Sequence, residues 1–117
     1  MIKNKSGVWG EVYAARYLRD KKYKILTTNY SCRFGEADII ALSGDTVCFV
    51  EVKTRDESTK TRPMEAVDEA KQQKLTLTAE NFLSFIGEDK PARFDVCEVY
   101  LDENMKAVKI NYIENAF

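Results

Sequence analysis

Two acidic residues and a lysine occupy spacings that could bind a divalent cation. Asp38 precedes the turn signal Ser43-Gly44-Asp45, and Glu51 and Lys53 follow it. If this turn holds a two-residue hairpin loop, Asp38 faces Glu51, Glu36 faces Lys53, and all four side chains share one face of a sheet. Carboxylates directly opposite each other repel, and a cation between them reverses the sign of that interaction. The spacing therefore predicts a metal site, with Lys53 as a donor within its reach.

Counting outward from the same loop pairs Leu42 with Val47 and Ile40 with Phe49. The shared face of the hairpin is therefore apolar near the turn and ionic at the end farther from it. A solvated sheet end with a salt bridge from Glu36 to Lys53 is the alternative, and such bridges contribute little stability. The apolar composition of both strands marks them as central, where unpaired charges are rare. Composition thus favours a bound ligand. Relief of repulsion predicts that Asp38→Ala leaves the metal-free protein as stable as before, or slightly more stable.

The chain contains no histidine. It therefore lacks the imidazole base of Ser-His and Cys-His nucleophile pairs and the usual ligands of most zinc enzymes. The cysteines Cys32, Cys48 and Cys97 are widely spaced, which is typical of buried free thiols in a reducing cytoplasm. The glycines are not grouped into a phosphate-binding loop. The remaining carboxylates and lysines suit hard cations such as Mg²⁺.

Length and charge indicate the number of domains, the cellular location and the expected affinity for nucleic acid. The 117 residues indicate a single domain over 1–117. The start of the sequence has no signal-peptide pattern, and no apolar run approaches the roughly 20 residues of a membrane span, which predicts a cytoplasmic protein with no membrane partner. Eighteen basic and 19 acidic residues give a net charge of −1. Affinity for nucleic acid should therefore be modest and steeply salt-dependent.

Periodicity predicts an α/β domain, a mixed sheet covered by helices. The expected order is a helix, three strands, a helix and two strands. The predicted helices span about 5–22 and 64–86, the predicted strands span 23–30, 36–42, 46–54, 93–101 and 106–113, and a mobile polar loop spans 55–63.

Asp38 followed by Glu51-Val52-Lys53 resembles the PD-(D/E)xK signature of restriction-endonuclease-like nucleases, with Ala37 where the signature has proline. The ordered motifs of nearly the whole chain resemble more closely the YraN-like family of small bacterial proteins. These motifs are Gly10-Glu11, Ala15, Tyr17-Leu18, Asn29-Tyr30, Gly35-Glu36-Ala37-Asp38, Phe49 to Arg55, Lys71, Lys74-Leu75, Arg93-Phe94-Asp95-Val96 and Asn115-Ala116-Phe117.

The resemblance implies a three-layer α/β/α restriction-endonuclease-like fold and metal-dependent hydrolysis of phosphodiester bonds in DNA. Activity could be structure-specific, as in Holliday-junction resolvases. It further implies that Asp38, Glu51 and the carbonyl of Val52 hold Mg²⁺ or Mn²⁺, and that Lys53 acts on the attacking water or on developing charge. Glu11 lies on the apolar stripe of the first helix and resembles a helical glutamate that some resolvase-like members add to the site. A peripheral helix charge is the alternative.

Three further basic residues are interpreted as phosphate contacts. Lys71 and Lys74 lie on one side of the second helix, and Arg55 follows the strand of Glu51. Lysine stems that cover an apolar face are the alternative. Arg93 and Asp95 share a strand face and are predicted to form a structural pair.

Two non-catalytic classes stay open beside the nuclease. A nucleic-acid-binding module that assists a recombination or repair complex would not be stabilised by Mg²⁺ or Mn²⁺. A structural interaction protein would not bind DNA at any salt concentration. The expected partner is nucleic acid, with DNA ahead of RNA, and a homodimer is compatible with the sequence.

Overall fold

The computed structural model describes residues 5–58 and 69–117. The predicted order of helix, three strands, helix and two strands is confirmed within these residues. The elements are α1 (Lys5–Asp20), β1 (Lys24–Cys32), β2 (Gly35–Ser43), β3 (Thr46–Asp56), α2 (Glu69–Ile86), β4 (Ala92–Leu101) and β5 (Ala107–Ile113).

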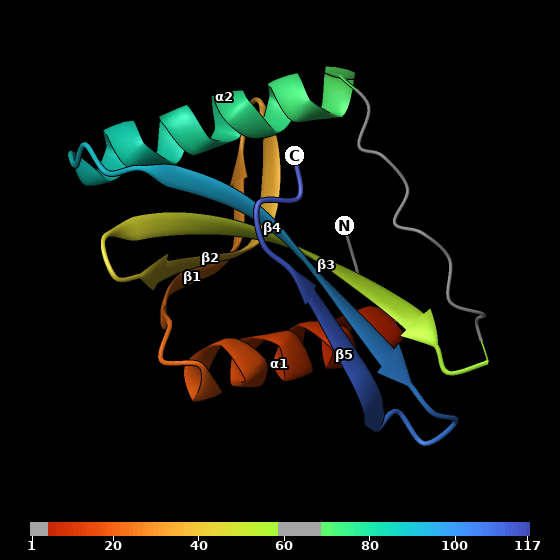
Figure 1. The fold of residues 1–117 in the computed structure, drawn as a ribbon. Helices are drawn as coiled ribbons and strands as arrows, with labels where there is room; N and C mark the ends of the chain where they lie inside the picture. The colour runs from red at the N-terminus through yellow and green to blue at the C-terminus, as the bar shows by residue number, and fades with distance from the viewer. Residues whose placement is uncertain (1–4, 59–68) are drawn as a thin grey trace.

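The strands form one five-stranded sheet in the order β1-β2-β3-β4-β5. Among the described strands only β3 and β4 pair in parallel, because the chain crosses over through α2 between them, whereas the other neighbours are antiparallel. The helices α1 and α2 lie on opposite sides of the sheet (Figure 1). The predicted mixed sheet covered by helices is thus confirmed.

Each helix covers its own apolar cluster. Beneath α1, the side chains of Ala14 and Leu18 pack on Ile39, Val50 and Val99. Beneath α2, Ala79 and Phe82 pack on residues that include Ile40 and Phe49. Cys48 and Cys97 are buried free thiols, as predicted, and Cys32 is half-buried. No helix in the described ranges is long and apolar enough to cross a membrane.

The structure corrects two predicted boundaries, the end of α1 and the end of β3. The predicted start of the second helix falls outside the described residues. The helix α1 ends at Asp20 because Lys22 takes a φ of 71° and the Tyr23 N–H donates to the Leu18 carbonyl, which closes a left-handed C-cap. The strand β3 continues to Asp56, so Arg55 lies in a strand and not in a loop. The rest of the predicted loop from 59 to 63, and the predicted helix start at 64–68, fall outside the described residues.

Candidate metal and nucleic-acid site

The β2–β3 hairpin has the predicted two-residue loop. Ser43 pairs with Thr46, Leu42 with Val47 and Ile40 with Phe49, and the ladder ends at Ile39 and Val50. The two outer pairs predicted from the sequence, Asp38 with Glu51 and Glu36 with Lys53, are therefore not part of the ladder. The sequence pattern thus predicted the β2–β3 register near the turn correctly, but it did not predict where the pairing of the two strands ends.

The Asp38 carboxylate explains where the ladder stops. Its Oδ2 accepts a hydrogen bond of 2.8 Å from the Val52 N–H. In a continued antiparallel ladder this N–H would donate to the Ala37 carbonyl. The side chain of Asp38 thus replaces a backbone acceptor, and the strands separate at the site. This hydrogen bond is a reason to expect that Asp38→Ala destabilises the protein, the opposite of the expectation from charge repulsion alone.

Side-chain alternation also breaks at Asp38. Ala37 and Ile40 both pack in the cluster beneath α2, although strict alternation would place them on opposite faces. On β1 the same place is marked by Asn29, whose φ is 54° and which lies between the paired positions Thr28 and Tyr30. A left-handed residue inside a strand turns the local backbone. The irregularity coincides with the place where Asp38 contacts β3.

Glu51 combines a strong contact with an unsatisfied atom. Its Oε1 lies 2.5 Å from the Lys71 ammonium and 3.6 Å from the Lys53 ammonium. Its Oε2 is buried and has no hydrogen-bond partner among the described residues. Leaving a buried charged acceptor unpaired is costly, because the group loses water without gaining a partner. The second oxygen of Glu51 therefore lacks the partner that a buried carboxylate oxygen normally has.

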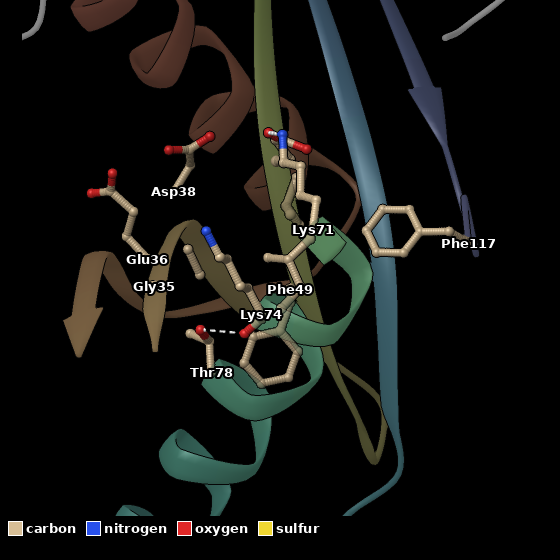
Figure 2. Close-up of a pocket in the computed structure, with 12 residues that line it drawn as sticks. Gly35, Glu36, Asp38, Phe49, Lys71, Lys74, Thr78 and Phe117 are labelled. Carbon is tan, nitrogen blue, oxygen red and sulfur yellow. Dashed lines mark hydrogen bonds and ion pairs between the residues drawn. The ribbon is translucent and has the colours of Figure 1, made fainter. Parts of the chain in front are cut away.

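A cavity of about 260 Å³ lies in front of these carboxylates. We call it the β2–β3 pocket. Its charged lining comprises Glu36, Asp38 and Glu51 from the sheet and Lys71 and Lys74 from α2. Figure 2 shows Glu36, Asp38 and Lys74 pointing into the same opening. The predicted metal ligands Asp38 and Glu51 thus share one pocket with two of the three predicted phosphate contacts.

The other predicted basic residues, Lys53 and Arg55, are not among the residues that line the pocket. Lys53 pairs with Glu51 and not with Glu36. Arg55 lies 3.8 Å from the Glu98 carboxylate on β4. The buried Glu98 is the register partner of Lys53 on β4 and also accepts a hydrogen bond from Asn111. Sequence reasoning missed Glu98, although an acidic residue inside the apolar run 96–101 was the available signal.

Glu11 belongs to a second hollow on the α1 side of the sheet. This hollow is bordered by Glu11, Arg16 and Arg19 of α1, by Asn29 of β1 and by Glu36 of β2. Glu36 borders both hollows, whereas Glu11 does not line the β2–β3 pocket. The two hollows therefore share Glu36, and Glu11 lines the hollow next to the one that Asp38 and Glu51 line.

The predicted structural pair of Arg93 and Asp95 is present and buried. Asp95 is 0% exposed and accepts hydrogen bonds from Arg93, from the Tyr112 hydroxyl at 2.5 Å and from the Asn115 N–H at 2.9 Å. Burial, followed by the hydrogen bond to Asp95, raises the pKa of Tyr112. This network ties the residues after β5 to β4.

The oxygen atoms of the candidate site suit a cation that takes some of its ligands from water or phosphate. Among the described residues, no three His, Cys, Asp or Glu side chains converge on one point. Mg²⁺ needs no such cluster, because one or two carboxylates usually hold it together with water and substrate phosphates. In an extended strand the carbonyl of a residue points to the same side as its N–H, so the Val52 carbonyl is expected to face β2, the strand of Asp38. Two carboxylates and this carbonyl could therefore hold Mg²⁺.

Comparisons with known proteins place the chain in a family. Residues 10–99 match the model described as "Uncharacterised protein family UPF0102". A UPF0102 protein of Alkaliphilus oremlandii (strain OhILAs) is 47% identical over 119 residues, which cover 99% of this chain and 100% of the relative. A UPF0102 protein of Caldanaerobacter subterraneus subsp. tengcongensis is 45% identical over 113 residues, or 95% of this chain and 93% of the relative. One of Chlorobium chlorochromatii (strain CaD3) is 40% identical over 115 residues, or 95% and 89%. The chain therefore belongs to the YraN-like family UPF0102.

Proposed function

We propose that this protein is a metal-dependent nuclease of the PD-(D/E)xK type that hydrolyses phosphodiester bonds in DNA. The proposal rests on the buried, unpartnered Oε2 of Glu51, a residue that lines one pocket together with Asp38. It includes a restriction-endonuclease-like arrangement of the three layers and a preference for a branched or flapped substrate, as in Holliday-junction resolvases. The fold alone does not define the reaction, so the site residues must supply the argument.

The residues present fit a magnesium or manganese ion, because Glu51 has a buried acceptor with no partner among the described residues. Asp38, Glu51 and the Val52 carbonyl would hold the ion, which polarises a bound phosphate and lowers the pKa of bound water. The Lys53 ammonium, 3.6 Å from Glu51, would orient the attacking water and offset charge that develops at phosphorus. The exposed side chain of Lys74 would bind a neighbouring phosphate.

The Lys71–Glu51 ion pair favours a second candidate function. With its ammonium 2.5 Å from Glu51, Lys71 neutralises a carboxylate that would otherwise bind a cation. A module that binds nucleic acid without cutting it could keep this pair permanently. In a nuclease, Lys71 must release Glu51 and turn to the phosphate backbone. The two candidates therefore differ in whether Mn²⁺ stabilises the native protein.

Single-turnover cleavage tests the nuclease directly. A panel of branched, flapped, single-stranded and duplex DNA is incubated with an excess of protein in Mn²⁺ and in Mg²⁺. Lys53→Ala should bind the preferred substrate normally and cleave it at least about a hundredfold more slowly, the scale of losing acid–base assistance. Lys106→Ala, an exposed lysine in the β4–β5 turn, is the matched control and should cleave at the rate of the unmodified protein. Full activity of Lys53→Ala, or no cleavage of any substrate by the unmodified protein, would reject the nuclease.

A further inference from the structure

Three phenylalanine rings form a stack that ends at the β2–β3 pocket. The ring centroids of Phe49 and Phe94 are 5.7 Å apart, and those of Phe94 and Phe117 are 5.4 Å apart with an interplanar angle of 22°. Phe49 is buried, whereas Phe117 is half-buried and lines the pocket. In Figure 2 the Phe117 ring and the Asp38 carboxylate stand on opposite sides of Lys71. The outermost ring of the stack thus borders the candidate metal site.

Hydrogen bonds to the backbone hold Phe117 in this place. Asn115 adopts a φ of 53°, and its N–H donates to the buried Asp95 carboxylate at 2.9 Å. The Ala116 N–H donates to the Phe94 carbonyl at 2.7 Å. Both residues that precede Phe117 are therefore fixed to β4. The ring is pre-positioned at the pocket, and a ligand would spend little free energy on ordering it.

The surroundings of Phe117 match the requirements of an unpaired nucleobase. Proteins bind single-stranded nucleic acid by combining basic side chains along the backbone with aromatic rings on which bases stack. Lys71 and Lys74 line the pocket that Phe117 borders. The cavity of about 260 Å³ is slightly smaller than pockets for drug-sized ligands, which run from about 300 Å³. One flat ring system fits this space, whereas a base inside a continuous duplex has both faces covered by its neighbours.

We infer that Phe117 stacks on an unpaired nucleobase beside the phosphate bound at the β2–β3 pocket. The inference rests on the proposed function and narrows its substrate class. The substrate is nucleic acid with a single-stranded segment at the site, such as a flap or a frayed end. Continuous duplex lacks the free base face that the ring needs.

Binding measurements with divalent cations chelated test this inference apart from cleavage. The probes are a fluorescently labelled flap, a single strand and a blunt duplex, each made as DNA and as RNA. Phe117→Leu keeps an apolar side chain but removes the aromatic face. It should weaken binding to the flap and the single strand about 5- to 150-fold, the range for losing one base–aromatic stack. Its binding to blunt duplex should change less than about twofold, and Phe117→Tyr should bind like the unmodified protein. Whether Phe117→Leu loses more affinity for the DNA probes or for the RNA probes shows which nucleic acid supplies the base.

Phe85→Leu is the matched control. Phe85 is 78% exposed on α2 and does not line the β2–β3 pocket. Its substitution should leave binding to all probes unchanged, so a loss confined to Phe117→Leu reports the pocket. Equal losses for the two variants, or equal losses for flap and duplex, would overturn the stacking role.

Photo-crosslinking of the unmodified chain covers the case in which Phe117→Leu does not fold. A 5-iodouracil base at the unpaired position should crosslink to Phe117, as mapped by peptide mass spectrometry. A crosslink that maps elsewhere, or an unmodified chain that binds none of the probes, would overturn the inference. Specific binding through Phe117 without cleavage in any metal would reject the nuclease and retain the stacking site. If Phe117→Leu cleaves every substrate at the rate of the unmodified protein, the stacking site would be rejected and the nuclease retained.

Discussion

The Lys71 ammonium on α2 lies 2.5 Å from Oε1 of Glu51 on β3, whereas Oε2 of the same carboxylate is buried without a partner among the described residues. One carboxylate therefore joins the helix to the sheet through one oxygen, while its other oxygen has no partner among the described residues. A divalent cation that enters the pocket must compete with the lysine for the charge of Glu51. If the protein binds a metal as proposed, its affinity would therefore depend on Lys71, a residue that would not itself bind the metal.

Lys71→Met is expected to tighten Mn²⁺ binding, because it removes the competing ammonium. Lys71 is 43% exposed, and ion pairs of that kind contribute up to about 1 kcal/mol. The gain in affinity should accordingly be about fivefold, measured by isothermal titration calorimetry. Lys74→Met is the control, since Lys74 lines the same pocket without an ion pair to any described residue. Weaker Mn²⁺ binding by Lys71→Met than by the unmodified protein would contradict the competition.

Asp38→Ala is expected to lower the free energy of unfolding by about 1 kcal/mol, because it leaves the Val52 N–H without its acceptor. Asp38→Asn keeps an acceptor oxygen and should stay close to the unmodified protein in a urea denaturation. Neither variant should show the rise in melting temperature on adding Mn²⁺ that the unmodified protein is expected to show. If Asp38→Ala is as stable as Asp38→Asn, the hydrogen bond to Val52 contributes nothing to the fold.

The order of the elements and the inner register of the β2–β3 hairpin were predictable from the sequence. Alternating apolar residues and the Gly44-Asp45 loop determine which residues face each other near the turn. The outer register was not predictable, because counting assumes that backbone pairs with backbone. At Asp38 a side chain replaces the backbone acceptor, and no periodicity reports that substitution.

Contacts between distant segments account for the rest of the site. The pairing of Lys71 with Glu51 depends on where α2 lies across the sheet, which local propensity does not specify. The place of Glu11 in a separate hollow depends likewise on how α1 packs. The position of Phe117 at the pocket follows from hydrogen bonds of Asn115 and Ala116 to β4. The residues of the candidate site could thus be nominated from the sequence, whereas the partners of each residue required the tertiary structure.

The buried thiols predict how stability depends on alkaline pH. Burial, with the Asp95 charge acting in the same direction, raises the pKa of Cys48 from 9.0 to about 11. Burial, assisted by the Glu98 charge, raises the pKa of Cys97 from 9.0 to about 12. Well below pH 9 both thiols are protonated in the folded and unfolded chains, and they do not change the free energy of unfolding with pH. Above pH 9 the unfolded chain ionises first, so stability falls until the folded thiols ionise as well.

Each thiol should remove on the order of 2 kcal/mol from the free energy of unfolding by pH 11, since one pKa unit corresponds to about 1.4 kcal/mol. Denaturation curves between pH 8 and 11 should therefore fall less steeply for Cys48→Ala and for Cys97→Ala than for the unmodified protein. Comparing slopes with pH separates ionisation from the cavity that each alanine leaves, because the cavity cost does not vary with pH. Parallel curves for all three proteins would show that the thiols do not titrate as their burial requires.

Gly10 sets the distance between α1 and β3. A Cβ at this position would lie 2.1 Å from Oγ1 and 3.2 Å from Cβ of Thr54. Alanine is favoured over glycine inside a helix by about 1 kcal/mol, but overpacking a tight contact costs about 1–3 kcal/mol. The steric cost should win, because the β-branched Thr54 has few rotamers with which to yield. Gly10→Ala is therefore expected to lower the free energy of unfolding by about 1 kcal/mol.

A double-mutant cycle with Thr54→Ala separates the two effects of Gly10→Ala. Removing Oγ1 and Cγ2 of Thr54 leaves only the 3.2 Å contact with its Cβ. In the Thr54→Ala background, Gly10→Ala should cost less than in the unmodified protein, or become stabilising through helix propensity. Urea denaturation of the four proteins gives the coupling energy. If Gly10→Ala costs the same in both backgrounds, the approach of α1 to Thr54 does not require a glycine.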